Sequence, residues 1–136
     1  MIVADTGAIV ALIDADDAHH AEMVAAFEDE RDWILPWAIL PEVDYLLLTH
    51  VGDAAQQAFV RDVAEGAYAV EWDGAGDLER AHEICARYAS LHLGLVDAVV
   101  IAIAERLRPT AIATLDVRDF GAVKIKGAPK LFPRDG

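Results

Sequence analysis

The 136-residue sequence is poor in cysteine, serine and positive charge, and each shortage argues against a class of function. Cys85 is the only cysteine, so the chain forms no internal disulfide and a reducing compartment, the cytoplasm, is expected. Ser90 is the only serine and no nucleophile elbow surrounds it, which argues against a serine hydrolase. The histidines form no H-E-x-x-H pattern, so a zinc hydrolase is not indicated either.

Nucleotide-cofactor motifs and membrane segments are also missing. The sequence contains neither a Walker A loop nor a dinucleotide-binding glycine fingerprint. The apolar run from Ala98 to Ala104 is far too short to span a bilayer, and Asp5 interrupts the N-terminus where a signal peptide would be apolar. We therefore expect a cytoplasmic protein with no membrane partner.

Acids outnumber Lys and Arg by 24 to 11, which gives a formal net charge of −13. This balance opposes nucleic-acid binding, because affinity for phosphate comes from Lys and Arg. In residues 118–136, however, the cations exceed the acids, and metal ions at an acidic site would let a local basic patch guide a polyanion. Ordinary solvated surface explains this basic tail equally well. The candidate RNA-binding cations in it are Arg118, Lys124, Lys126 and Lys130.

Length and composition fit a single α/β domain over residues 1–136. The sequence is 55% hydrophobic, which suits a parallel sheet covered on both faces by helices. Strands are expected at 1–4, 33–35, 68–72 and 111–114, with 123–125 as a candidate fifth strand. Helices are expected at 8–13, 18–30, 42–50, 53–65, 77–91 and 95–107. The alternation predicts a three-layer sandwich with a mostly parallel central sheet flanked by helices.

Three acids stand where such a fold would place a site. Asp5 follows the first expected strand and Asp116 the fourth, so both open onto the same sheet edge if these strands are neighbours. Capping of the next helix explains Asp5 equally well. Asp97 is the only polar side chain in the apolar helical segment 95–104, where a carboxylate is costly unless it is paired, protonated or bound to a cation. Exposure near the helix start, favoured by the helix dipole, is the alternative for Asp97.

Two further acids, Glu42 and Asp44, interrupt the apolar segment 38–48. Periodicity does not decide which of them faces inward, and an ordinary acid in the first helical turn is the favoured interpretation of Asp44. Carboxylates gathered without paired histidines are hard oxygen ligands, suited to Mg²⁺ or Mn²⁺.

Four segments resemble the PIN-domain family, and most closely its VapC-type toxins of bacterial toxin–antitoxin pairs. They are Ile2–Gly7, Pro41–Tyr45, Leu93–Ala98 and Thr114–Phe120, and their order and spacing cover nearly the whole chain. The resemblance implies a PIN-like fold and a set of site residues. The implied acids are Asp5, Glu42, Asp97 and Asp116, with Asp119 as the accessory or alternative last acid, and Thr6 and Thr114 orienting carboxylates or water through their hydroxyls.

The same resemblance implies a Mg²⁺-dependent endoribonuclease, with Mn²⁺ as the alternative metal. It also implies an RNA substrate, a homodimer and a cognate antitoxin protein as partner. A PIN-like protein that only binds RNA or a partner is the main alternative. A phosphoacceptor receiver domain is a weaker one, because Asp5 has no adjacent acid, and a haloacid-dehalogenase phosphatase would need an acid where Gly7 stands.

Overall fold

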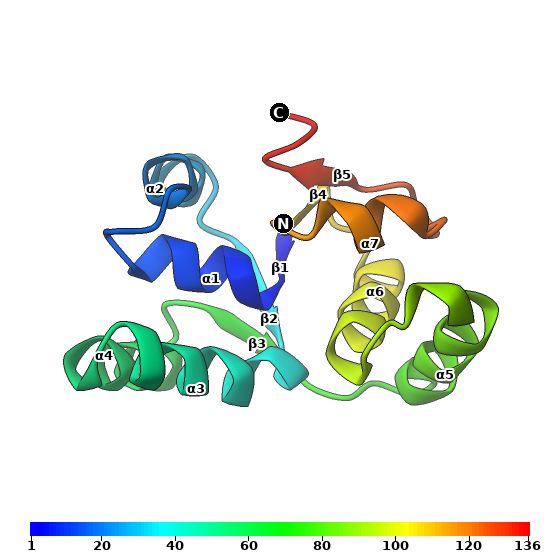
Figure 1. Ribbon diagram of the computed structural model, residues 1–136, viewed down its shortest axis with the longest axis horizontal. Helices are drawn as coiled ribbons and strands as arrows, with labels where there is room; N and C mark the ends of the chain where they lie inside the picture. The colour runs from blue at the N-terminus through cyan, green and yellow to red at the C-terminus, as the bar shows by residue number, and fades with distance from the viewer.

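A computed structural model of the chain describes all residues from 1 to 136 and contains one five-stranded sheet (Figure 1). The strand order is β3-β2-β1-β4-β5, and every neighbouring pair is parallel. The strands are β1 Ile2–Ala4, β2 Trp33–Pro36, β3 Ala69–Glu71, β4 Ala111–Ala113 and β5 Lys130–Phe132. The expected mostly parallel sheet is therefore confirmed.

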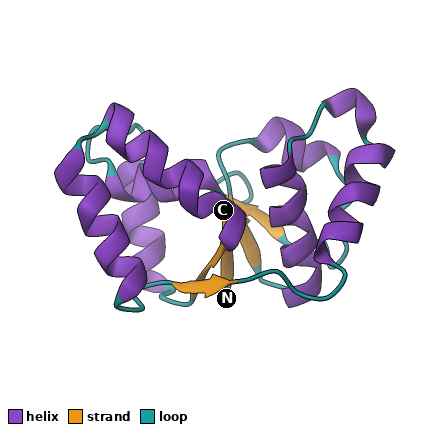
Figure 2. Ribbon diagram, turned by 90° about the horizontal axis from the view of Figure 1, so that it is seen from below, coloured by secondary structure: helices purple, strands orange, loops and turns teal.

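Helices cover both faces of the sheet, as the three-layer prediction requires. In Figure 1, α1 to α4 lie on one side of the strands and α5 and α6 on the other, and Figure 2 shows the same two groups from below. The α-helices are α1 Thr6–Ile13, α2 His20–Asp29, α3 Leu40–His50, α4 Asp53–Ala64, α5 Asp77–Arg87, α6 Leu95–Leu107 and α7 Val117–Ala122. Two short 3-10 helices, η1 Trp37–Ile39 and η2 Ala89–Leu91, precede α3 and α6. None of the helices combines the length and the apolar character needed to cross a membrane.

The core forms where the sheet meets these helices. Val3 and Ala4 of β1 and Ile112 of β4 are fully buried, because a central parallel strand is covered on both faces. Helix α6 packs against β1 and β2 on one side and against α5 on the other, so its residues from Ala98 to Glu105 are all buried. This double contact explains why the sequence of α6 is apolar on nearly every face.

The C-terminal part of the chain differs from the expectation. Residues 123–125 are not a strand, and the fifth strand is β5, after a short helix α7 that was not predicted. Val123 and Ile125 are buried, which produced the strand-like alternation, but the backbone between and after them bonds to side chains. The Lys124 N–H donates to the Tyr88 hydroxyl, and the Lys126 N–H donates to Glu105. The prediction of a strand at 123–125 was therefore wrong, because these residues alternate in burial but do not pair with a neighbouring strand.

The sheet order positions a site at one edge. Strands β1 and β4 are neighbours, with Ala4 opposite Ala113, so the residues that follow them leave the sheet side by side. The chain crosses to opposite faces from these two strands, and such a switch point is where open α/β sheets form ligand sites. Asp5 follows β1, and Thr114 follows β4.

Candidate active site

Asp5 is buried and held by a threonine from the neighbouring strand. The Thr114 hydroxyl donates to Asp5 Oδ2 at 3.0 Å, and the Asp5 N–H donates to the Ala113 carbonyl at 2.9 Å. Asp5 is 7% exposed and Thr114 is fully buried. Although Asp5 stands at the N-cap position of α1, its side chain makes no capping hydrogen bond. The carboxylate is therefore turned to β4, and the capping explanation does not account for it.

The same threonine orders the loop that carries the last two acids. Thr114 Oγ1 accepts a hydrogen bond from the Asp116 N–H at 3.0 Å, so one hydroxyl contacts both Asp5 and Asp116. Asp116 caps α7 by accepting from the Asp119 N–H at 3.1 Å. The turn 114–119 thus sets the positions of two carboxylates at the start of one short helix.

Three carboxylates meet at this edge. One oxygen each from Asp97, Asp116 and Asp119 lies within 4.8 Å of the other two, and all three residues are half-buried. No lysine or arginine forms an ion pair with any of them. An oxygen-only donor set with uncompensated negative charge fits a hard divalent cation such as Mg²⁺.

The electrostatics of the site extend to Asp5 and Glu42. Burial, followed by the charges of four neighbouring acids, raises the pKa of Asp97 to about 7; those acids are Asp5, Asp116, Asp119 and Glu42. Burial also raises the pKa of Asp5, against hydrogen bonds from the Thr6 backbone and the Thr114 hydroxyl, and the charges of Glu42 and Asp116 raise it further. We call these five acids, Asp5, Glu42, Asp97, Asp116 and Asp119, the acid cluster.

Glu42 and Thr6 stand at the margins of this arrangement. Glu42 is exposed in the first turn of α3 and influences the pKa of Asp5 and Asp97 from outside the three-carboxylate group. The Thr6 hydroxyl is buried directly after Asp5 and has no hydrogen-bond partner. Asp44 instead accepts a hydrogen bond from Gln56 on α4 at 2.6 Å, so it is a structural link between two helices.

Each member of the acid cluster stands at the N-terminal end of a helix. Asp5 and Asp116 occupy N-cap positions, and Glu42, Asp97 and Asp119 lie in first turns. The partial positive charge of a helix N-terminus stabilises a nearby carboxylate by about 0.3–1 kcal/mol. Burial and then the charges of the neighbouring acids act against this effect at Asp97 and raise its pKa to about 7.

The candidate cations are not gathered on one surface. Lys124 and Lys126 line a pocket together with Arg80 and Arg87 of α5, whereas Lys130 lies on β5 beside a different pocket. Arg118 is exposed on α7. The contribution of α5 was missed because the two parts of this pocket are more than thirty residues apart in the sequence, and no local pattern joins them.

Comparisons with known proteins place the chain in a family. The PIN domain profile matches residues 2–126. Ribonuclease VapC26 of Mycobacterium tuberculosis is 34% identical over 125 residues, which are 90% of this chain and 92% of that protein. Among solved structures, VapC20 of M. tuberculosis, a Sarcin-Ricin loop cleaving toxin, superposes with a TM-score of 0.81 at 24% identity, covering 95% of this chain and 99% of that one. FitAcB of Neisseria gonorrhoeae gives a TM-score of 0.70 at 16% identity, over 97% and 96%.

The profile match extends over the whole region that contains the sheet edge and the acid cluster, and the VapC relative spans nearly the same length. The sequence matches and the likeness of fold agree with one another. The chain is a member of the PIN-domain family, with its relatives among the VapC proteins.

Proposed function

We propose that the chain is a Mg²⁺-dependent endoribonuclease and the toxin of a toxin–antitoxin pair. The observation that carries this proposal is the meeting of Asp97, Asp116 and Asp119 within 4.8 Å, without a balancing cation. We propose RNA as the substrate because the chain is 34% identical to a VapC ribonuclease over nearly its full length. Mn²⁺, which prefers the same oxygen ligands, is the alternative metal.

The acid cluster fits the expected metal by its chemistry. Asp5 and Asp97 would hold one cation, Glu42 and Asp116 would help to hold it or a second ion, and Asp119 is the accessory ligand. The buried Thr6 hydroxyl, which has no protein partner, is a polar group available to a ligand or water beside Asp5. A divalent cation bound there supplies a more acidic water and neutralises charge on the phosphoryl oxygens.

The protein's own residues prepare the site for RNA. The Thr114 hydroxyl fixes the Asp5 carboxylate and the Asp116 backbone, so these two acids keep their positions when a phosphate approaches. With a pKa near 7 in the absence of metal, the Asp97 carboxyl exchanges a proton close to neutral pH, and metal ligation requires the deprotonated form. Metal binding is therefore expected to weaken as the pH falls below about 7.

We further propose that residues 1–136 act as one domain in the cytoplasm, as a homodimer inhibited by an antitoxin protein. Two of the structural neighbours are toxin–antitoxin assemblies, from Rickettsia felis and Klebsiella pneumoniae, with TM-scores of 0.70 and 0.69. The unpaired Cys85 is compatible with a reducing compartment.

The test is a cleavage assay on a mixed RNA pool with Mg²⁺, Mn²⁺ or EDTA, using protein free of any antitoxin. We expect metal-dependent cutting by the wild type and by Asp44→Asn, and loss of cutting in Asp97→Asn and Glu42→Gln. Asp44 is the matched control, because it lies on the same helix as Glu42 and bonds to Gln56. RNA binding without cutting by any form would instead support a PIN-like protein that acts by binding alone.

A further inference from the structure

A pocket of positive charge lies outside the acid cluster. It has a volume of about 680 Å³, and its charged lining residues are Arg80 and Arg87 from α5 and Lys124 and Lys126 from the segment after α7. No acid lines it, although the whole chain carries a net charge of −13. We call this feature the basic pocket. Positive charge concentrated in one pocket of a negatively charged protein attracts a ligand of negative charge.

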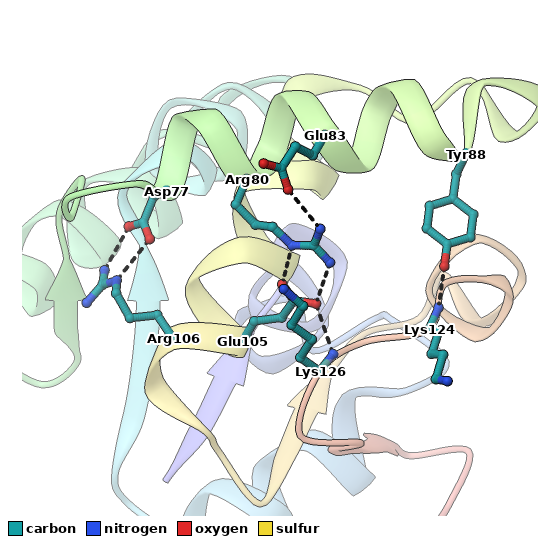
Figure 3. Close-up of polar contacts among 8 residues, drawn as sticks. All are labelled: Asp77, Arg80, Glu83, Tyr88, Glu105, Arg106, Lys124 and Lys126. Carbon is teal, nitrogen blue, oxygen red and sulfur yellow. Dashed lines mark hydrogen bonds and ion pairs between the residues drawn. The ribbon is translucent and has the colours of Figure 1, made fainter.

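The walls of the basic pocket are fixed by hydrogen bonds to the buried Glu105 carboxylate (Figure 3). The Arg80 guanidinium donates to the two carboxylate oxygens of Glu105 at 2.6 and 3.1 Å, and it also contacts Glu83 at 3.2 Å. Glu105, only 7% exposed on α6, accepts a further hydrogen bond from the Lys126 N–H at 2.9 Å. These bonds tie the segment with Lys124 and Lys126 to α5 and α6, so the pocket is organised before a ligand binds.

Three of the four cations, Arg87, Lys124 and Lys126, take part in none of the ion pairs. The fourth, Arg80, is matched by Glu105 and Glu83. In Figure 3 the Lys124 side chain points away from the Arg80–Glu105 pair. Tyr88 contacts Arg87 and the backbone of Lys124. The guanidinium carbon of Arg87 lies 5.8 Å from the centre of the Tyr88 ring, and the Tyr88 hydroxyl accepts from the Lys124 N–H.

A further cation borders the same segment because of a glycine. Gly127 adopts a φ of +91°, and a Cβ added there would lie 2.7 Å from Nη1 of Arg108. The absence of a side chain lets the Arg108 guanidinium pack directly on the backbone of this turn. Arg108 forms no ion pair, so it adds to the positive potential at this side of the molecule.

Two stretches of chain join the basic pocket to the acid cluster. Helix α7, six residues or about 9 Å long, follows its N-cap Asp116 and ends at Ala122, just before the segment with Lys124. From Tyr88, the chain passes through η2 to the first turn of α6, where Asp97 lies. The basic pocket and the acid cluster are therefore linked by two short stretches of the chain.

We propose that the basic pocket binds the phosphate backbone of the RNA substrate next to the cleavage site, with Arg87 and Lys124 as the phosphate contacts and the Tyr88 ring as a surface for a base. This inference rests on the proposed ribonuclease function. Free cations around an aromatic ring are typical of sites for single-stranded nucleic acid, where phosphates bind the cations and bases stack. Lys130, on β5 at a different pocket, is not part of this site.

The test compares RNA binding by the double variant Arg87→Gln/Lys124→Gln with that by Lys130→Gln, all in an Asp97→Asn background that prevents cutting. Anisotropy of a labelled single-stranded RNA is measured over a salt series with Mg²⁺ present. Loss of two phosphate contacts should weaken binding on the order of tenfold at low salt and reduce the slope of log K against log salt by about 1.4. Lys130→Gln should behave like its parent. The substituted side chains are exposed or free of ion pairs, and a thermal melt verifies folding.

Equal affinities and slopes for the double variant, Lys130→Gln and their parent would overturn the proposal. Loss of binding to a poly-glutamate probe, with RNA binding intact, would overturn it too and assign the pocket to an acidic protein segment. The cleavage assay separates this outcome from failure of the proposed function. If the wild type cuts RNA with metal and the double variant, carrying native Asp97, cuts equally well, only the proposed role of the pocket is rejected. If RNA binds through the pocket but no form of the protein cuts it, only the proposed nuclease function is rejected.

Discussion

A single hydroxyl group organises two acids of the site. Thr114 donates to Asp5 and accepts from the Asp116 N–H in a fully buried position. Replacing the hydroxyl by a methyl group in Thr114→Val keeps the shape of the side chain but leaves a buried carboxylate and an N–H without this partner. We expect a loss of about 1–3 kcal/mol in unfolding free energy and a fall in cleavage of about 10- to 100-fold, measured by denaturant unfolding and RNA cutting.

Thr114→Ser is the matched control for that substitution. Serine keeps the hydroxyl and loses only a methyl group, so cutting should stay within a few-fold of wild type. If the serine variant were as inactive as the valine variant, packing of the methyl group and not the hydrogen bonds would hold the two acids in place.

The charge of Asp97 destabilises the folded protein when no metal is bound. Its folded pKa of about 7 exceeds the value of 3.8 expected in the unfolded chain, because of burial and then the neighbouring acids. A carboxyl group whose pKa is raised in the folded state stabilises that state most at pH values below its unfolded pKa. This stabilisation is lost as the pH rises through the folded pKa of about 7. We therefore expect wild-type stability in EDTA to fall between about pH 4 and pH 7.

Asp97→Asn should lack this part of the pH dependence. In EDTA at neutral pH its unfolding free energy should equal that of wild type or exceed it by up to about 2 kcal/mol, although cutting is lost. Thermal melts over the pH range measure both. A variant that melts well below wild type in EDTA would show that Asp97 has a structural role instead.

At the scale of elements, buried ion pairs join α5 to α6. Glu105 of α6 pairs with Arg80, and Arg106 pairs with Asp77 at the start of α5. Burial opposes ionisation of Glu105, but hydrogen bonds from Arg80 and the Lys126 N–H hold the pKa of this carboxyl below its usual value. Its stabilising contribution is present above the unfolded pKa near 4.5 and is lost as the pH falls through the lower folded value.

Glu105→Gln should therefore lower the unfolding free energy at neutral pH by about 3 kcal/mol, because Arg80 keeps its charge but loses its buried partner. Denaturant unfolding measures this loss, and hydrogen exchange should quicken at the Lys126 N–H. Glu83→Gln is the control: Glu83 contacts the same guanidinium from an exposed position, and its loss should cost less than about 1 kcal/mol. Equal losses in both variants would contradict the role of the buried bond.

At the scale of the whole molecule, the net charge of −13 and the acid cluster make stability depend on cations. A ligand present at about 100 times its Kd stabilises the folded state by about 2.7 kcal/mol, which corresponds to roughly 10 °C in Tm for a chain of this size. We expect Mg²⁺ to raise the Tm of wild type by such an amount and that of Asp97→Asn much less. KCl of equal ionic strength controls for general screening, and equal effects of the two salts would argue against a specific site.

The sequence predicts elements well where a pattern is local. The bounds expected for the apolar helix 95–107 agree with α6, and those of the first four strands agree to within one residue at each end. The prediction fails in residues 117–132, where α7 was missed and the fifth strand was placed too early. There the buried Val123 and Ile125 have the alternation of a strand, while the Tyr88 hydroxyl and Glu105 take the backbone hydrogen bonds that a neighbouring strand would supply.

The sequence by itself determined most of the alternation of strands and helices and the placing of Asp5, Glu42 and Asp97 at the starts of helices, because periodicity and turn residues act over a few positions. Only the tertiary structure decided which of these groups meet. Parallel pairing of β1 with β4 brings Thr114 to Asp5, 109 residues away, and packing of α6 on the sheet brings Asp97 to Asp116 and Asp119. The basic pocket depends in the same way on contacts between distant segments. Such contacts arise from burial of apolar surface shared by the whole chain, which no short stretch of sequence contains.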